Sequence, residues 1–281
     1  MLAEDSLREG RVDEALAQLQ DAVRNNPADA KYRVFLFQLL AVLGQWDRAL
    51  NQLNVSGELD PATLAMVQMY SEALQCEGLR AQIFAGQRTP VVFGEPEEWI
   101  ALIIEGLKHT AEGRHAQGQE LRARALQGAP TTSGSLTSGV VPAPGEKETE
   151  SEPKPFEWIA DADSRFGPIL EAIVFGKYYW VPFHRIRELH IERPEDLRDL
   201  VWAPAHFTWA NGGEAVGLIP TRYPGSEASE DGLIRLSRRT DWQEQEGDAY
   251  LGLGQRVLAT DTEEYALLSL RTLRFDTTPD E

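Results

Sequence analysis

Small and apolar residues in the first 61 positions of the chain repeat with a period of 34 residues. The matched pairs are Gly10 and Gly44, Val12 and Trp46, Ala15 and Ala49, Leu16 and Leu50, Leu19 and Leu53, and Pro27 and Pro61. In each copy the apolar positions lie three or four residues apart, which predicts an amphipathic helix with one buried face. The glycines suit the positive φ at a helix end, the alanines let two helices approach closely, and the prolines stop the second helix.

This period and this order of residues are typical of tetratricopeptide repeats, in which each repeat is a pair of antiparallel helices. The predicted helices cover residues 2–9, 11–25, 30–43, 46–53 and 61–76. The helix over 30–43 is apolar nearly all round, so we expect it to be covered on more than one side. Because one repeat cannot bury its apolar face alone, the copies must stack on one another.

The repeat pattern weakens after Gly78 and returns near Trp99. Between these residues we expect at most a short helix over 79–85 and an irregular connection over 87–99. A last helical pair then follows. The pattern is interpreted as about three and a half degenerate repeats over residues 1–128.

Residues 129–155 differ sharply in composition from the helical part, since 16 of these 27 residues are Pro, Gly, Ser or Thr. A segment of this kind has almost nothing to bury, which predicts a flexible linker. The sequence thus predicts an α+β multidomain protein. Its parts are an N-terminal all-α tetratricopeptide-like array over 1–128, a linker over 129–155 and a C-terminal β-rich domain over 156–281.

The β-rich prediction rests on short apolar segments, rich in Val, Ile, Tyr and Trp, that alternate with turn signals. The expected strands cover residues 169–175, 178–183, 197–202, 207–210, 216–219, 233–236, 257–259 and 265–275. Residues 170–175 and 194–200 could instead be helical, since a proline and acidic residues favour a first helical turn in the second of these segments. Asn211-Gly212-Gly213 predicts a tight turn.

Charge and composition narrow the choice of partners and compartment. A net charge of -18 argues against nucleic acid and against anionic membranes as partners. Partners with basic patches fit this charge, but acidity that only maintains solubility is the favoured interpretation. The single cysteine, Cys76, cannot form an intrachain disulfide and lies in an apolar helical stretch, so we expect a buried, inert thiol in a reducing cytoplasm. The N-terminus is too charged for a signal peptide, and no apolar run is long enough to span a membrane.

Candidate catalytic and metal-binding residues are present only in weak patterns. Asp161 and Asp163 lack the further ligands and the glycine of a calcium loop, so surface or capping roles are favoured. His184, His190 and His206 do not have the spacing of a known zinc motif, and surface or hydrogen-bonded roles are favoured for them as well. We therefore expect no metal and no cofactor.

Anion-binding patterns are also weak. Gly252 and Gly254 form a lone GxG, and residues 221–226 are better interpreted as a structural turn with an ion-paired Arg222 than as an anion-binding loop. There is no GxSxG, no P-loop and no GxGxxG after a strand. An enzyme would need its ionisable groups to converge on one pocket, and the residues that could do so are Asp161, Asp163, His206, Glu214 and Arg222.

The concave face of the helical array is the main candidate for binding, because stacked repeats form a groove suited to an amphipathic helix or an extended peptide. Repeat geometry places Val34, Gln38, Gln68, Glu72, Ile100 and Ile104 along it. The alternative is that Val34, Ile100 and Ile104 only pack neighbouring helices. Surface candidates in the C-terminal domain are Trp209, Asn211, Glu214, Arg222 and Tyr223, and we expect at least one of Trp158, Trp180, Trp202 and Trp209 to be partly exposed at an interface.

Three long strings of the C-terminal half resemble one protein family. They are FEWIADADSRFGPILEAIVFGKYYWVPF, RPEDLRDLVWAPAHFTWANGGEAVGLIPTRYPGSE and GLGQRVLATDTEEYALLSLRTLRF. They are similar to the ImpE family, also called TagJ or SciE-type proteins, which are accessory proteins of type VI secretion. The resemblance covers nearly the whole chain except the linker, because that family also has a repeat-like helical N-terminal part.

The resemblance implies a cytoplasmic, non-enzymatic adaptor that binds the N-terminal helix of the small sheath subunit, TssB. It also implies a link to disassembly of the contractile sheath by the ClpV unfoldase. The resemblance assigns no catalytic residue and does not say which domain holds the helix. Two other hypotheses stay open: an enzyme with an acid/base or metal site in the C-terminal domain, and a homo-oligomer that assembles through its repeats.

Overall fold

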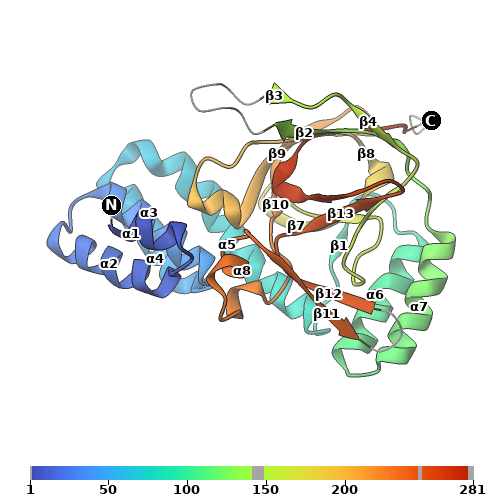
Figure 1. Ribbon diagram of the computed structural model, residues 1–281, viewed down its shortest axis with the longest axis horizontal. Coiled ribbons are helices and arrows are strands. Elements are labelled where there is room, and N and C mark those ends of the chain that lie inside the picture. Colours follow the sequence, from blue (N-terminus) through green and yellow to red (C-terminus); the bar gives the residue numbers. More distant parts are fainter. Residues whose placement is uncertain (1, 141–148, 246–248, 278–281) are drawn as a thin grey trace.

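The computed structural model describes residues 2–140, 149–245 and 249–277. Its first half is helical, as predicted, and α1 to α4 lie to the left of the strands in Figure 1. The helices are α1 (Leu2–Arg8), α2 (Val12–Asn25), α3 (Ala30–Val42), α4 (Trp46–Leu59), the 3-10 turn η1 (Pro61–Thr63), α5 (Leu64–Phe84), α6 (Glu98–Ala111) and α7 (His115–Gly128). The prediction of an N-terminal tetratricopeptide-like helical region followed by a strand-rich domain is confirmed.

The glycines and alanines of the 34-residue repeat have the conformation and the burial that the sequence predicts. Gly10 and Gly44 have φ values of +77° and +67°, in the left-handed region that a helix end needs. Ala15 and Ala49 are fully buried where neighbouring helices approach each other. Helix α3 packs against α2, α4 and a 3-10 turn of the C-terminal domain, η3 (Leu197–Leu200), so the prediction of cover on more than one side is confirmed.

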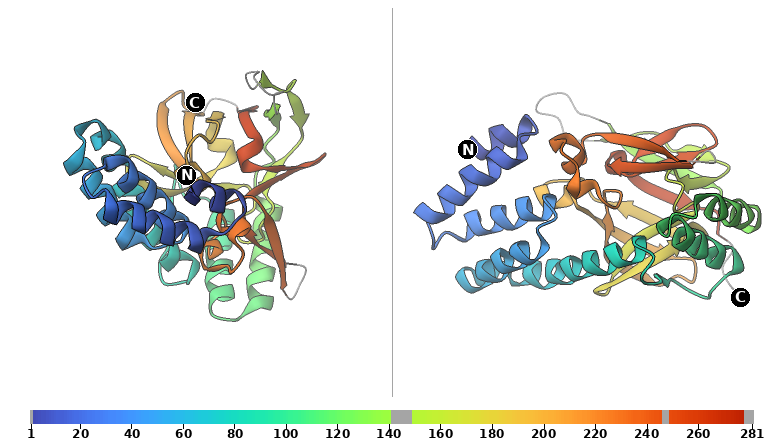
Figure 2. Two further views of the ribbon diagram at one scale, coloured as in Figure 1. Left: turned by 60° about the vertical axis from the view of Figure 1, so that its left-hand side comes forward. Right: turned by 90° about the horizontal axis from the view of Figure 1, so that it is seen from below.

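Helix α5 is longer than the sequence suggests, and the prediction of a break after Gly78 is wrong. A glycine inside a helix costs only about 1 kcal/mol, and buried contacts of the following turn outweigh this. Arg80 and Ile83 are both buried against the C-terminal domain. Figure 2 shows α5 running from the helical array along the strand-rich part. The connection after it is also more ordered than expected, since Val91–Val92 forms strand β1.

The main sheet has ten strands. They are β1, β2 (Gly134–Val140), β3 (Thr149–Glu150), β4 (Lys154–Phe156), β6 (Ile169–Val174), β7 (Lys177–Pro182), β8 (Ile186–Ile191), β9 (Trp202–Trp209), β10 (Glu214–Pro220) and β15 (Leu270–Phe275). Their order is β1-β7-β6-β10-β9-β8-β15-β2-β3, with β4 also paired to β2. Only β1 runs parallel to its neighbour, β7; the other pairs are antiparallel. The sheet is strongly curved, as Figure 1 shows.

Smaller elements complete the C-terminal domain. They are the sheet of β5 (Ile159–Asp161), β13 (Val257–Thr260) and β14 (Glu264–Ala266), the hairpin of β11 (Thr240–Gln245) and β12 (Ala249–Gly254), and the short helices η2 (Phe183–Arg185), η3, η4 (Ser226–Ala228), α8 (Gly232–Arg235) and η5 (Leu267–Ser269). Residues 170–175 thus fall largely in a strand and 194–200 end in a 3-10 turn. The strand expected over 233–236 is wrong, because α8 covers most of it. The tight turn at Asn211-Gly212-Gly213 is confirmed between β9 and β10, with φ +85° at Gly212.

The prediction of a flexible linker over 129–155 is wrong for the residues that form β2, β3 and part of β4. Strand β2 lies inside the sheet, paired to β15, and its Leu136 is buried. The small residues that suggested disorder meet a packing need instead: a Cβ on Gly134 would lie 2.0 Å from the carbonyl oxygen of Arg274. Residues 141–148, the middle of the predicted linker, lie outside the described residues.

Strand β6 separates two apolar cores and is buried on both faces. Ile169 and Ile173 face the core that the helices share with the sheet, whereas Leu170 and Val174 face a second core enclosed by the curved sheet. This alternation follows from the two-residue period of a strand. Within the described residues, no helix is both long enough and apolar enough to cross a membrane.

Candidate protein-binding groove

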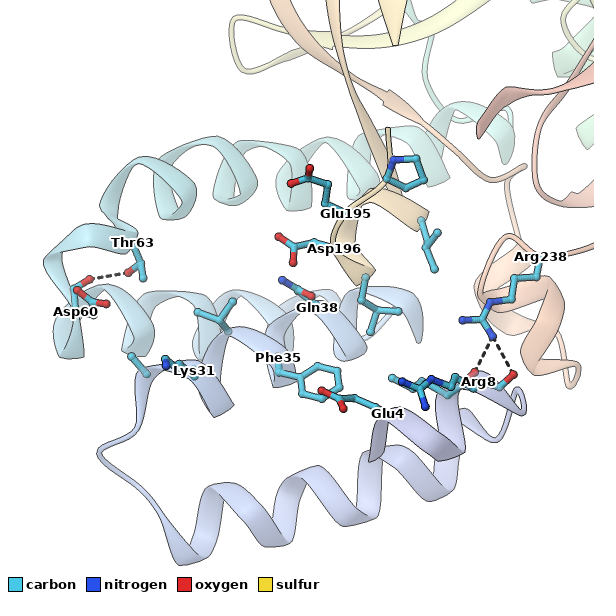
Figure 3. Close-up of a pocket in the computed structure, with 16 residues that line it drawn as sticks. Glu4, Arg8, Lys31, Phe35, Gln38, Asp60, Thr63, Glu195, Asp196 and Arg238 are labelled. Carbon is cyan, nitrogen blue, oxygen red and sulfur yellow. Dashed lines mark hydrogen bonds between the residues drawn. The ribbon is translucent and has the colours of Figure 1, made fainter. Parts of the chain in front are cut away.

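An open cavity of about 650 Å³ lies on the inner face of the first repeats, where the helices meet the C-terminal domain. Helices α1 and α3, the η1 turn and the segment around η3 form its walls (Figure 3). The lining residues are Glu4, Leu7, Arg8, Ala30, Lys31, Val34, Phe35, Gln38, Asp60, Thr63, Pro194, Glu195, Asp196, Leu197, Leu200 and Arg238. We call this cavity the groove.

The groove combines apolar side chains with charges of both signs around its rim. Phe35 of α3 and Leu197 of η3 are partly buried hydrophobic residues that pack onto the helical core. Figure 3 shows Glu195 and Asp196 on the wall that faces Lys31 of α3 across the groove. An apolar surface with charged rims is the kind of surface that binds one face of an amphipathic helix.

Hydrogen bonds from the C-terminal domain hold two walls of the groove. Arg238 donates through Nη1 to the carbonyl oxygens of Leu7 (2.8 Å) and Arg8 (3.2 Å), where α1 leaves carbonyls without partners in the helix. On the opposite wall, Asp199 Oδ2 accepts from the backbone N–H groups of Glu195 (2.9 Å) and Asp196 (2.8 Å). The groove is therefore built jointly by both halves of the chain.

A buried ionic network joins the second half of α5 to the sheet. Glu171 of β6 accepts from Arg80 through both carboxylate oxygens, at 2.6 and 2.9 Å, and also from Tyr178 and Arg256. Arg256 donates to Asp161 as well. Burial alone would raise the pKa of Glu171, but Arg80 and Arg256 outweigh it and hold that pKa at about 2. Burial raises the pKa of Asp161 to about 6 against the lowering effect of Arg256.

Comparisons with known proteins agree with this architecture. Residues 153–274 match the family model described as ImpE protein, and residues 6–72 match a tetratricopeptide repeat model. A protein of Pseudomonas aeruginosa named type VI secretion system accessory component TagJ is 49% identical over 278 residues, which are 99% of this chain and 92% of that protein. This chain belongs to the ImpE, or TagJ, family. A Vibrio parahaemolyticus protein with a crystal structure is 25% identical, with a TM-score of 0.84 over 99% of this chain and 98% of that one.

The six residues predicted along one groove of this ImpE-family chain lie in several places. Val34 and Gln38 line the groove, whereas Gln68 and Glu72 line a separate cavity of about 310 Å³ between α5 and the sheet. Ile104 lines a third cavity, of about 180 Å³. Ile100 is buried in the core, so the packing alternative is right for it. The prediction of a single continuous groove is wrong, because the C-terminal domain packs against α5 and α6–α7 lies far from α1–α4 (Figure 1).

Three of the five surface candidates in the C-terminal domain are buried, so their prediction as surface residues is wrong. Trp209 is 5% exposed, Arg222 is 4% exposed and Tyr223 is fully buried. Arg222 donates to the carbonyl oxygens of Ala41, Val42 and Arg235, and so fixes α3 to the C-terminal domain. Asn211 and Glu214 are exposed at the turn between β9 and β10. Of the four tryptophans expected to include a partly exposed one, Trp158 is exposed by 41%.

The residues considered for an enzyme do not converge on one pocket. Asp161 and Asp163 are buried, so the surface role predicted for them is wrong, but each accepts from a nearby backbone N–H as a capping residue does. His206 pairs with Glu192 at 3.1 Å on an outer face of the sheet. Glu214 lies at an exposed turn. Among the described residues, no group of three or more His, Cys, Asp or Glu could hold a metal ion.

Two further expectations concern single residues. Cys76 is buried, as predicted, and burial raises the pKa of its thiol to about 12, which keeps it protonated and unreactive. The glycine at position 252 serves packing, because a Cβ there would lie 2.2 Å from the Tyr223 ring. A phosphate site is not needed to explain it.

Sequence reasoning missed the groove residues that the C-terminal domain supplies. Leu197 and Leu200 lie three residues apart behind a proline and acidic residues, a pattern that indicates a short amphipathic turn. Nothing local indicates that this turn packs on α3. Phe35 could have been found, because it follows Val34 in the nearly all-apolar helix.

Proposed function

We propose that this ImpE-family protein is a non-enzymatic adaptor of type VI secretion that holds the N-terminal helix of the small sheath subunit in the groove. The observation that carries the proposal is the groove itself, with its apolar floor and a rim of charges of both signs on the inner face of tetratricopeptide-like repeats. The Pseudomonas aeruginosa relative is named as an accessory component of the type VI secretion system. That name supports the choice of partner.

The shape and chemistry of the groove favour a helix over a small molecule. Its residues come from α1, α3, η1 and η3, so the lining extends over several turns and is not one deep pocket. Val34, Phe35 and Leu197 would receive the apolar stripe of a helix, whose anchors recur every three or four residues. Glu195 and Lys31 would face its charged flanks.

The proposal includes a cytoplasmic location and a link to sheath disassembly by the ClpV unfoldase. Both are taken from the family resemblance. In this arrangement the groove holds a helix of the sheath subunit, and the adaptor binds that subunit without transforming it.

The network around Glu171 supports a role without catalysis. A catalytic carboxylate needs to reach a substrate with at least one oxygen. Both oxygens of Glu171 already accept hydrogen bonds from two arginines and a tyrosine, and Asp161 accepts from Arg256, Tyr223 and the backbone of Asp163. The buried acids of the C-terminal domain are thus committed to holding the fold.

Calorimetric titration with a peptide of the sheath subunit's N-terminal helix tests the proposal. Val34→Glu places a charge on the apolar floor, and we expect affinity to fall by roughly tenfold or more. Ile104→Glu, also at a half-buried isoleucine or valine position but in another cavity, is the matched control and should keep the affinity of the unmodified protein. Circular dichroism would verify that both variants fold. Unchanged affinity in Val34→Glu, or equal losses in both, would contradict the groove as the site.

A further inference from the structure

Gln38 is the one polar residue in the most buried part of helix α3. Residues 36–42 are all buried, and the other six are apolar. Gln38 itself is only 6% exposed. A leucine would suit the packing of this helix better, because a buried amide needs hydrogen-bond partners and an apolar side chain does not. The fold of α3 therefore does not explain a glutamine at this position.

The Gln38 amide points into the groove and has no partner of its own. Figure 3 shows it in the middle of the groove, between the wall that carries Asp196 and the side chain of Phe35. No hydrogen bond joins this amide to any other residue that the structure describes. Its amide atoms are not sealed from the cavity, so water reaches them in the free protein.

A helix bound along α3 would change the surroundings of this amide. The groove follows α3 from Ala30 to Gln38, which is about 12 Å at roughly 1.5 Å per residue, and Val34 and Phe35 lie one turn before the amide. An uninterrupted apolar stripe would take water away from the amide and leave its donor and acceptor unpaired, which weakens binding. A stripe with one amide or hydroxyl side chain at this level would replace the lost water.

A single hydrogen-bonded pair within an apolar contact also fixes the register, that is, how far one helix is shifted along the other. Apolar anchors that recur every three or four residues fit a groove in several registers. Only one of these registers places a given polar side chain opposite Gln38. A buried asparagine fixes the register of coiled coils for the same physical reason.

We propose that Gln38 selects the bound helix and sets its register, by pairing with one amide or hydroxyl side chain within the apolar stripe of that helix. Because this pairing takes place in the same groove, it rests on the proposed capture of the sheath-subunit helix. The stripe that fits the groove is interrupted by one polar residue, which lies one turn from the apolar anchor that meets Val34 and Phe35.

A double-mutant cycle measured by calorimetric titration tests the pairing. The ligands are the natural peptide of the sheath subunit's N-terminal helix and peptides in which its Asn, Gln, Ser and Thr residues are replaced, one at a time, by apolar residues of similar size. Gln38→Met should lower the affinity for the natural peptide by roughly tenfold, and one of the peptide substitutions should do the same with the wild-type protein. Gln38→Met combined with that peptide should regain the affinity, because two apolar side chains then face each other.

Two controls separate this pairing from a structural role. Gln68→Met, at a glutamine of α5 outside the groove, is the matched variant and should leave every affinity unchanged. The melting temperature of Gln38→Met should stay the same or rise, since an apolar side chain needs no partner in this part of α3. A groove that Gln38→Met merely distorts would bind both kinds of peptide weakly, so regained affinity points to the pair.

The possible outcomes distinguish the role of Gln38 from helix capture itself. If Gln38→Met binds the natural peptide as tightly as the wild type does, or if no peptide substitution couples to it, Gln38 does not set the register, and helix capture in the groove still stands. A lower melting temperature of Gln38→Met would show that α3 needs the glutamine for its fold, which also overturns the proposed role. A wild-type protein that does not bind the natural peptide would overturn both proposals.

Discussion

The two halves of helix α5 face different surroundings although they belong to one continuous element. In the first half, Ala65, Gln68 and Met69 are exposed and line the cavity of about 310 Å³ between α5 and the sheet. In the second half, Glu77 and Arg80 are buried and contact strands of the sheet. One helix is thus exposed along its first half and anchored to the sheet by its second half.

The two halves of α5 differ most clearly in the hydrogen-bond and ion-pair partners of their charged side chains. Arg80 has a bidentate contact with Glu171 and also donates to the carbonyl oxygen of Arg222 at 2.7 Å. Glu77 accepts from the indole of Trp202 at 2.8 Å. Buried charges are tolerated only with partners such as these, whereas Glu72 in the first half is half-buried and keeps contact with solvent. Substitutions in the two halves should therefore affect different measurements.

Arg80→Leu should cause the largest loss of stability. This change leaves Glu171 and Glu77 with fewer partners in the interior, and we expect the free energy of unfolding to fall by about 3–5 kcal/mol. Gln68→Leu, at an exposed position of the same helix, should change it by about 0.5 kcal/mol or less. Urea denaturation measures both. Equal effects of the two substitutions would remove the distinction between the halves of α5.

The next largest effect should be a loss of stability in acid, when Glu171, the partner of Arg80, becomes protonated. The pKa of Glu171 is about 2 in the folded state, below its ordinary value of 4.5, so its contribution to stability is present above pH 4.5 and is lost as the pH falls towards 2. This contribution is about 3 kcal/mol, since one pKa unit corresponds to about 1.4 kcal/mol. Glu171→Gln should abolish that part of the pH dependence.

The pH range in which stability changes distinguishes Glu171 from Asp161. Asp161 acts in the opposite direction, because its pKa is raised to about 6 and its ionisation therefore lowers stability as the pH rises from about 4 to 6. Unfolding free energies below pH 4 thus report mainly on Glu171. A Glu171→Gln protein with the same slope as the wild type in that range would contradict the assignment.

The smallest effect is expected for Glu195→Gln in the groove. Glu195 is exposed, so the unfolding free energy should change by about 0.5 kcal/mol or less. The affinity for the sheath-subunit helix should fall a few-fold at low salt, and the difference should shrink as salt screens the charge. Calorimetric titration at two salt concentrations measures this, with Glu98→Gln on α6 as the control. A salt-independent loss would indicate that the Glu195 charge does not face the bound helix.

Elements fixed by local pattern could be predicted from the sequence, and those fixed by distant partners could not. Helices α2 and α3 follow from the 34-residue repeat, and the turn at Gly212 follows from its residue types. Helix α5 continues past Gly78 because Arg80 meets Glu171, which is 91 positions away. Strand β2 is ordered because of its pairing with β15, which no local signal in its serines and threonines indicates.

The residues of the groove also fall into a predictable group and an unpredictable one. Val34 and Gln38 were found from the repeat register, since they lie on the inner face of a first helix. Leu197, Leu200 and Arg238 come from segments that reach the groove only through the tertiary fold, and the sequence did not show that they meet α3. The buried state of Arg222 and Tyr223 could not be seen either, because an arginine and a tyrosine in a Pro-Gly loop usually indicate a surface turn.

Strand β15 has a consequence for how the protein is made. It lies between β8 and β2, both of which precede it in the chain, so a strand synthesised after its two neighbours fills a gap inside the sheet. Until Leu270–Phe275 emerges, β8 and β2 each lack a neighbour and expose hydrogen-bonding edges during synthesis. A nascent chain stalled before this strand should therefore need protection by chaperones, and removal of β15 should damage the whole sheet, because two interior strands lose a partner.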